Sequence, residues 1–247
     1  MLVNSKNIQA SSRIIKTIGI IGGLSPESTI VYYKLINNKF KKIFGGHNSA
    51  PIIIVSVNFQ EIVSAIYTQN WEKAAVILID AAKKLEAAGA DFIIIACNTL
   101  HKIAKDIEKS INIPLLHILK IAGDKIKNQF HFDTISMFGT KFTMQEDFHK
   151  KYLFDNFRIK CIDPSVSHIT LINEIIFNEL CHGIVNKNSE KIIKEIILDV
   201  HEKGAQAILL GCTEMHFLIN QETCEVPILD VTYLHAESAI NFSLTQQ

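Results

Sequence analysis

The sequence predicts an α/β protein made of two pseudo-symmetric α/β domains with mainly parallel sheets and an active site in the cleft between them. The first observation is that short apolar runs alternate with longer amphipathic stretches, which is the order of βαβ units in a parallel sheet. The second is an internal repeat, because residues 89–101 recur as residues 204–216 with Gly, Ala, Ile, Cys and His at matching places. Two halves of one shape normally face each other across a pseudo-twofold axis. Each half would then contribute one of the repeated cysteines to the cleft between them.

The individual elements follow from these patterns. Two amphipathic stretches, residues 71–88 and 189–203, have helical periodicity and end at Gly89 and Gly204, residues suited to a helix C-cap. Ser25-Pro26-Glu27 is typical of a helix start, because serine caps, proline fits the first turn and glutamate complements the helix dipole. The apolar runs predicted to form buried strands are residues 17–22, 52–57, 92–96, 115–118, 134–139, 207–210 and 228–231.

The domain boundaries follow from the repeat. We expect the first domain to contain residues 16–113 together with 228–247, and the second to contain residues 114–227. Residues 1–15 are mixed and polar without the apolar core of a signal peptide, so we expect a flexible N-terminal extension. No linker rich in Pro, Gly or Ser separates the domains, which predicts that they pack tightly.

Composition excludes several classes of partner. The 25 basic and 25 acidic side chains cancel, whereas proteins that bind nucleic acid or anionic membranes usually carry a basic excess. No run of about 18 apolar residues is present, so no membrane span is predicted. Five cysteines, an odd number without tight spacing, indicate reduced thiols and a cytoplasmic protein.

The two repeated cysteines are the candidate catalytic residues. Cys97 and Cys212 each follow a predicted strand directly, and ligands of parallel α/β sheets bind at the carboxyl ends of the strands. A helix beginning there would favour the thiolate and lower the pKa of each cysteine. Racemisation needs a base on one face of a carbon and an acid on the other, in a dry site that stabilises carbanion charge. Two opposed thiols would meet that need.

Polar residues around the two cysteines are candidate binding groups. Hydroxyl, amide and backbone N–H groups at these strand ends suit an α-carboxylate. The glycine-rich turn after the first strand lacks a nucleotide-binding pattern and is predicted to line one wall of the cleft. The predicted substrate-binding residues are Gly23, Leu24, Ser25, Asn58, Gln60, Asn98, Thr99, Thr140, Lys141, Thr213 and Glu214.

Each cysteine is followed four residues later by a histidine, His101 or His216. One interpretation is a Cys₂His₂ metal site that closes when the two domains meet. Another is that the histidines support the thiolates, and a third is that they are structural residues. We expect the supporting role, with no metal bound.

Three motifs carry a family resemblance: residues 19–29 (GIIGGLSPEST), residues 97–101 (CNTLH) and residues 210–214 (LGCTE). With these motifs the chain resembles the aspartate/glutamate racemase family, and residues 27–37 and 175–181 look like its bacterial aspartate/glutamate-specific subgroup. The resemblance implies two pseudo-symmetric domains, no pyridoxal phosphate or other cofactor, no metal, and a homodimer.

The resemblance also implies roles for residues. Cys97 and Cys212 would be the catalytic pair, and Asn98, Thr99 and Thr213 would bind the α-carboxylate and amine region of the substrate. The substrate would be aspartate or glutamate, interconverted in both directions because both cysteines are present.

One departure concerns the side-chain carboxylate of such a substrate. Some archaeal aspartate racemases use an arginine before the second strand and a lysine in the second half, where this chain has residues 47–51 (HNSAP) and 181–183 (CHG). A distal carboxylate would then need Lys141, His47, hydroxyls or backbone donors. The alternatives are a hydantoin racemase or maleate-isomerase-like enzyme, and a non-catalytic module that binds amino acids.

Overall fold

The first sheet has three parallel strands in the order β2 (Ile52–Ser56), β1 (Ile18–Gly22) and β3 (Phe92–Ile95). In this computed structural model, which describes residues 15–245, Ile18 lies opposite both Ile52 and Phe92. Leu115 extends the sheet beyond β3 by a single parallel bridge to Ile93. The expected N-terminal extension lies outside the described residues, apart from Ile15.

The second sheet repeats this order with β5 (Lys160–Cys161), β4 (Thr134–Phe138), β6 (Ala207–Leu210) and β7 (Ile228–Asp230), all parallel. The prediction of an α/β fold with parallel sheets is therefore confirmed. The two-residue β5 was not predicted, because so short a strand leaves no periodic pattern in the sequence.

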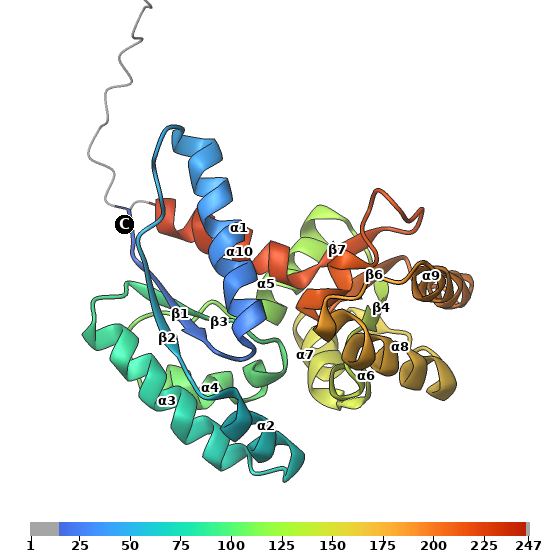
Figure 1. Ribbon diagram of the computed structural model, residues 1–247, viewed down its shortest axis with the longest axis horizontal. Helices are drawn as coiled ribbons and strands as arrows, with labels where there is room; N and C mark the ends of the chain where they lie inside the picture. Colours follow the sequence, from blue (N-terminus) through green and yellow to red (C-terminus); the bar gives the residue numbers. More distant parts are fainter. Residues whose placement is uncertain (1–14, 246–247) are drawn as a thin grey trace, which may run out of the picture.

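Helices cover both faces of the first sheet (Figure 1). One face packs against α1 (Pro26–Phe44) and α10 (Val231–Leu244), whose side chains share a core with β1 and β3. The other face packs against α3 (Trp71–Ala87), with α2 (Phe59–Tyr67) and α4 (Ala104–Glu108) beside it.

The second sheet is covered in the same way. One face packs against α8 (Val166–Asn178) and α9 (Lys187–Glu202), and α6 (Lys141–Gln145) adds Met144 to that core. The other face packs against α5 (Ile118–Asp124) and α7 (Asp147–Phe157), and a π-helical turn, η2 (Lys125–Gln129), continues α5. The short 3₁₀ turn η3 (Leu180–His182) follows α8.

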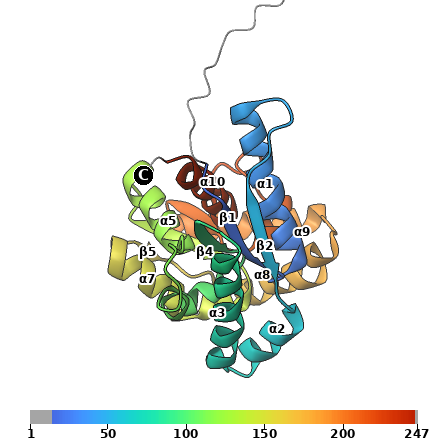
Figure 2. The ribbon, with the colours of Figure 1, turned by 90° about the vertical axis from the view of Figure 1, so that its left-hand side faces the viewer.

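Two helices are exchanged between the halves. Helix α5 follows the first sheet in the chain but packs in the core of the second, whereas α10 follows the second sheet and packs against α1 in the first. Figures 1 and 2 show α10 running beside α1, although most of the chain separates them in sequence.

The chain passes from one sheet to the other slightly later than the domain boundaries expected from the sequence. Leu115 pairs with the first sheet, and Ile228–Asp230 pairs with the second. The predicted strand at residues 115–118 was wrong beyond Leu115. The His117 side chain accepts the Leu119 N–H and begins α5 there.

The predicted helix ends are confirmed. Gly89 and Gly204 have φ of 91° and 104°, a left-handed conformation that glycine adopts without steric cost. Ser25 caps α1 by accepting the Ser28 N–H, with proline in the first turn. Over the described part of the chain, every helix is too short or too polar to cross a membrane.

Candidate active site

Cys97 and Cys212 lie on two loops that contact each other directly. Cys97 follows β3 and precedes the 3₁₀ turn η1 (Thr99–Ile103), and Cys212 follows β6 and precedes η4 (Thr213–Phe217). Asn98 Nδ2 donates to the Gly211 carbonyl at 3.5 Å. A Cβ at Gly211 would lie 3.1 Å from that nitrogen and 2.8 Å from Thr143 Cγ2, so glycine permits this close approach. The two halves therefore contact each other, as predicted, at the residues next to the two cysteines.

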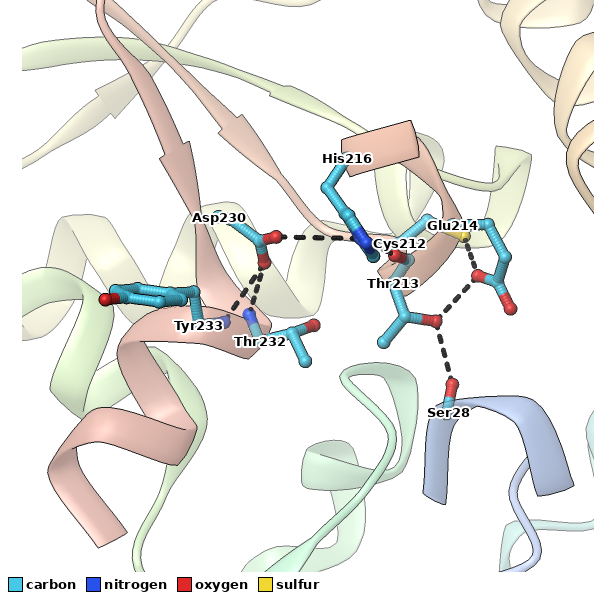
Figure 3. Close-up of polar contacts among 8 residues, drawn as sticks. All are labelled: Ser28, Cys212, Thr213, Glu214, His216, Asp230, Thr232 and Tyr233. Carbon is cyan, nitrogen blue, oxygen red and sulfur yellow. Dashed lines mark hydrogen bonds and ion pairs between the residues drawn. The ribbon is translucent and has the colours of Figure 1, made fainter. Parts of the chain in front are cut away.

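Glu214 organises the second cysteine loop. Cys212 Sγ donates to Glu214 Oε2 at 2.9 Å, and Thr213 Oγ1 donates to the same oxygen at 2.7 Å. Thr213 Oγ1 also lies 2.8 Å from Ser28 Oγ, in the first turn of α1 (Figure 3). A chain of hydroxyl and carboxylate contacts thus runs from the start of α1 in the first half to Cys212 in the second.

Both cysteines have raised pKa values, so the predicted lowering was wrong. Burial raises the pKa of the Cys97 thiol most, and the backbone N–H groups of Leu100 and Thr99 oppose that rise only partly. Burial also raises the pKa of Cys212, and the Glu214 carboxylate beside it raises it further. The elements that follow the cysteines are 3₁₀ turns of five residues, too short to build the dipole of a long helix. Both thiols are therefore protonated at neutral pH in the free protein.

The two histidines hold the cysteine loops. His101 Nδ1 donates to the Cys97 carbonyl at 2.9 Å, and His216 Nδ1 hydrogen-bonds to the Thr213 carbonyl. In the described part of the chain, no group of three His, Cys, Asp or Glu side chains is placed to hold a metal ion. Each histidine instead hydrogen-bonds to a backbone carbonyl of its own loop.

Each loop histidine faces the residue that caps the next long helix. The rings of His101 and His117 meet edge to face with centroids 4.9 Å apart, and His216 Nδ1 lies 3.9 Å from Asp230 Oδ2. His117 caps α5 and Asp230 caps α10. Sequence reasoning missed both residues, although the repeat gives a signal, since each lies three residues after the proline at 114 or 227.

A buried tyrosine completes the site. His235 Nε2 donates to the Leu116 carbonyl at 2.8 Å, so its Nδ1 accepts from the Tyr32 hydroxyl, also at 2.8 Å. Burial raises the pKa of the Tyr32 phenol most, and the charge of the Asp230 carboxylate raises it further.

A family model described as Asp/Glu/hydantoin racemase matches residues 21–239. The chain belongs to this family. Racemases of this kind work on amino acids without pyridoxal phosphate. A broad-specificity amino-acid racemase, RacX, from Bacillus subtilis is 26% identical over 93% of this chain and 99% of its own length.

Solved structures of similar proteins have the same fold. A putative Asp/Glu racemase from Yersinia pestis is 40% identical, with a TM-score of 0.88 over 93% of this racemase-family chain and 100% of its own. An aspartate racemase homologue from Pyrococcus horikoshii is 34% identical, with a TM-score of 0.84 over 92% of this chain and 99% of its own.

The residues of the glycine-rich turn in this family member make local contacts. The Gly23 N–H donates to Thr29 Oγ1 at 2.8 Å, Leu24 is buried in the core, and Ser25 is occupied as the cap of α1. Pro26 has no N–H, so the start of α1 offers few donors to a ligand.

The polar residues predicted after the second strand are used locally. Asn58 caps α2, and Gln60 Nε2 donates to Ser64 Oγ at 3.2 Å. Both side chains are exposed. In the second half, Thr140 caps α6, which is a local use as well.

Lys141 is exposed and lines a hollow of about 700 Å³ together with Lys102 and Glu146, which bond to each other at 2.6 Å. His47 follows α1 and precedes β2, so it lies at the amino end of the sheet, opposite the cysteine loops.

Of the predicted residues, the structure brings together Asn98, Thr213, Glu214, His101 and His216 with the cysteines, and Thr99 adjoins them in η1.

Proposed function

We propose that this protein racemises amino acids by moving the α-proton between Cys97 and Cys212 without a cofactor. The observation that carries the proposal is the direct contact between two equivalent cysteine loops, one from each half, at the carboxyl ends of two parallel sheets. Two acid–base groups on opposite sides of one small molecule are what inversion at a carbon requires.

The reaction begins from two protonated thiols. Cys212 passes its proton to Glu214, which already accepts its S–H, and the resulting thiolate removes the α-proton from one face of the substrate. The Cys97 thiol then gives its proton to the opposite face. This leaves Cys97 as the thiolate, which the backbone N–H groups of Thr99 and Leu100 stabilise. In the reverse direction the two sulfurs exchange roles.

Hydroxyl and amide donors suit the substrate carboxylate, on which charge accumulates when the α-proton leaves. Asn98 Nδ2 and the hydroxyls of Ser28 and Thr213 lie on or against the two cysteine loops, and Thr99 follows Asn98 in the chain. Donors fixed before the reaction stabilise developing charge because they need not reorganise. Buried side chains around Cys97 also exclude the water that would compete for these donors.

Aspartate or glutamate is the substrate that the sequence predicts, and the names of the structurally similar proteins from Yersinia pestis and Pyrococcus horikoshii agree with it. The homodimer and the cytoplasmic location are further predictions. The name of the Bacillus subtilis relative supports a wider range of amino acids.

The test is exchange of the α-proton in heavy water, followed by mass spectrometry and chiral chromatography of both enantiomers. Cys97→Ser and Cys212→Ser should each lower racemisation by at least about 10²-fold, because each removes one acid–base group. Cys224→Ser, at a cysteine outside the site, is the matched control and should keep full activity. A single mutant at residue 97 or 212 with near-normal turnover would refute the mechanism, and binding without deuterium uptake would identify a non-catalytic module.

A further inference from the structure

Tyr32 of α1 and His235 of α10 form a buried pair that takes no part in the proton transfers proposed above. The two helices lie side by side (Figure 1), and the two side chains are 1% and 0% exposed. His235 Nε2 donates to the Leu116 carbonyl, which leaves Nδ1 to accept the Tyr32 hydroxyl. The two rings also meet edge to face, with centroids 5.6 Å apart. These contacts give the imidazole of His235 one orientation and one tautomer.

The pair is bonded to the segment that follows along β3, the strand before Cys97. The Leu116 N–H donates to the Ile93 carbonyl of β3 at 3.0 Å, while the Leu116 carbonyl accepts from His235. Cys97 lies two residues beyond the end of this strand. Both backbone polar groups of Leu116 are therefore used, and one of these two hydrogen bonds depends on the orientation of His235.

His101 gives a second connection from the pair to the Cys97 loop. The ring of His101 meets that of His235 edge to face, with centroids 5.6 Å apart. His101 is 1% exposed, and its Nδ1 donates to the Cys97 carbonyl. Its Nε2 has no hydrogen-bond partner within residues 15–245, so one hydrogen bond and the packing of neighbouring rings orient this imidazole. A turn of the His235 ring would therefore disturb the contact that holds the Cys97 carbonyl.

The Cys97 thiol depends on the backbone of its loop more than the Cys212 thiol does. Cys212 Sγ donates to a side chain, that of Glu214, at 2.9 Å. The groups that bond to Cys97 Sγ are the backbone N–H groups of Thr99 and Leu100, in the turn that follows it. A displacement of this loop thus moves the Cys97 sulfur relative to the substrate, and a misplacement of about 1 Å can cost about 10²-fold in rate.

We propose that Tyr32 and His235 are positioning residues that hold the Cys97 loop for proton transfer at one of the two sulfurs. The inference rests on the proposed function, because it assigns the two residues a part in the same reaction. Without the Tyr32 hydroxyl, His235 Nδ1 is a buried acceptor that lacks a donor, and this unfavourable state favours a rearranged ring. The rearrangement reaches the Cys97 loop and leaves the Cys212 loop, in the other half, unchanged.

The test replaces Tyr32 by phenylalanine, which removes the hydroxyl and keeps the ring. The substrate is the amino acid that the native protein racemises fastest, used as each enantiomer with and without deuterium at the α-carbon. In Tyr32→Phe, kcat/KM should fall by about tenfold in both directions, because the equilibrium constant of racemisation is one. The deuterium isotope effect on kcat/KM should rise for the enantiomer whose α-proton Cys97 removes and fall for the other enantiomer, because transfer at Cys97 becomes the slower step.

Tyr33→Phe is the matched control, because it makes the same change at the neighbouring, 48% exposed tyrosine of α1, and it should behave like the native protein. His235→Gln is a second variant, which removes the ring in contact with His101 and should separate the two isotope effects as Tyr32→Phe does.

The outcomes distinguish this inference from the proposed function. If the isotope effects of the two enantiomers keep their native values or shift together, in variants with a lower melting temperature, the pair is purely structural and the inference is wrong. Native rates in Tyr32→Phe would overturn it as well, while the racemase function stands. If the native protein racemises no amino acid, the proposed function itself fails.

Discussion

At the scale of single residues, Glu214 has the largest influence on the candidate site, because its carboxylate acts on both thiols. Glu214→Gln should lower kcat by about 10²-fold, since the Cys212 proton loses its acceptor. The same change removes a negative charge that raises the pKa of Cys212, so alkylation of this thiol by iodoacetamide should begin at lower pH. Mass spectrometry of the labelled Cys212 peptide measures this shift.

The control for this prediction is Glu225→Gln, at an exposed glutamate on the loop before β7. It should change neither turnover nor the pH at which Cys212 is alkylated. If Glu214→Gln left the alkylation profile of Cys212 unchanged, the carboxylate would not be the group that sets its ionisation.

At Gly23 the neighbouring backbone leaves no room for a side chain. The φ of Gly23 is +76°, and a Cβ would lie 2.2 Å from the Val57 carbonyl oxygen. Gly45 has a similar φ of +70° but open space around it. Gly45→Ala should therefore cost about 1 kcal/mol of unfolding free energy from conformational strain. Gly23→Ala should cost at least about 2 kcal/mol more, because the collision adds to the strain. Urea denaturation of both variants decides the matter, and equal losses would contradict the close packing at Gly23.

At the scale of elements, Asp230 begins the helix that returns to the first half. Its Oδ1 accepts the N–H groups of Thr232 and Tyr233 at the start of α10. Asp230→Ala should lower the unfolding free energy by about 1 kcal/mol, the usual value of an N-cap. Asp230→Asn keeps an accepting oxygen and should preserve most of that stability. Thermal denaturation compares them, and equal losses in the two variants would assign the effect to the charge instead of the cap.

The long elements could be predicted from the sequence, and the short ones could not. The helix from Trp71 to Ala87 and the strand from Ala207 to Leu210 match their expected bounds closely, because their periodicity extends over the whole element. The two-residue β5 and the 3₁₀ turns after Cys97 and Cys212 carry no such pattern. The predicted pKa direction was wrong chiefly because both thiols are buried, and the short turns that follow them offset that burial only partly.

At the scale of the whole molecule, a set of buried neutral histidines makes stability depend on pH. Burial lowers the pKa of His117, His149 and His235 to about 4, against about 6.5 in an unfolded chain. Between these values the unfolded state binds a proton that the folded state does not. The folded state therefore loses stability as pH falls from about 6.5 to 4, by about 3 kcal/mol for each such group.

One histidine offers a direct test of this effect. His149 is 1% exposed, and neither ring nitrogen has a partner among the described residues. His149→Leu should reduce the loss of unfolding free energy between pH 6.5 and 4 by about 3 kcal/mol. Urea denaturation at a series of pH values measures it. A pH dependence identical to that of the native protein would show that His149 accepts a proton in the folded state.

The candidate site could be predicted as far as the internal repeat reaches. Cys97, Cys212 and the two histidines that follow them stand out because they recur at matching places. Ser28, Tyr32 and His235 could not be found in this way, since they reach the site through the packing of α1 against α10 and have no repeated counterpart.

The exchange of α5 and α10 between the halves has a consequence for synthesis on the ribosome. Ala236, Ala239 and Ile240 of α10 belong to the same core as Ile18 and Ile20 of β1. This face of the first sheet, which α1 also covers, therefore lacks the part of its cover that α10 supplies until α10 has left the exit tunnel. Contacts of such long sequence separation slow folding. The nascent N-terminal half thus keeps part of its apolar surface exposed until α10 has been synthesised.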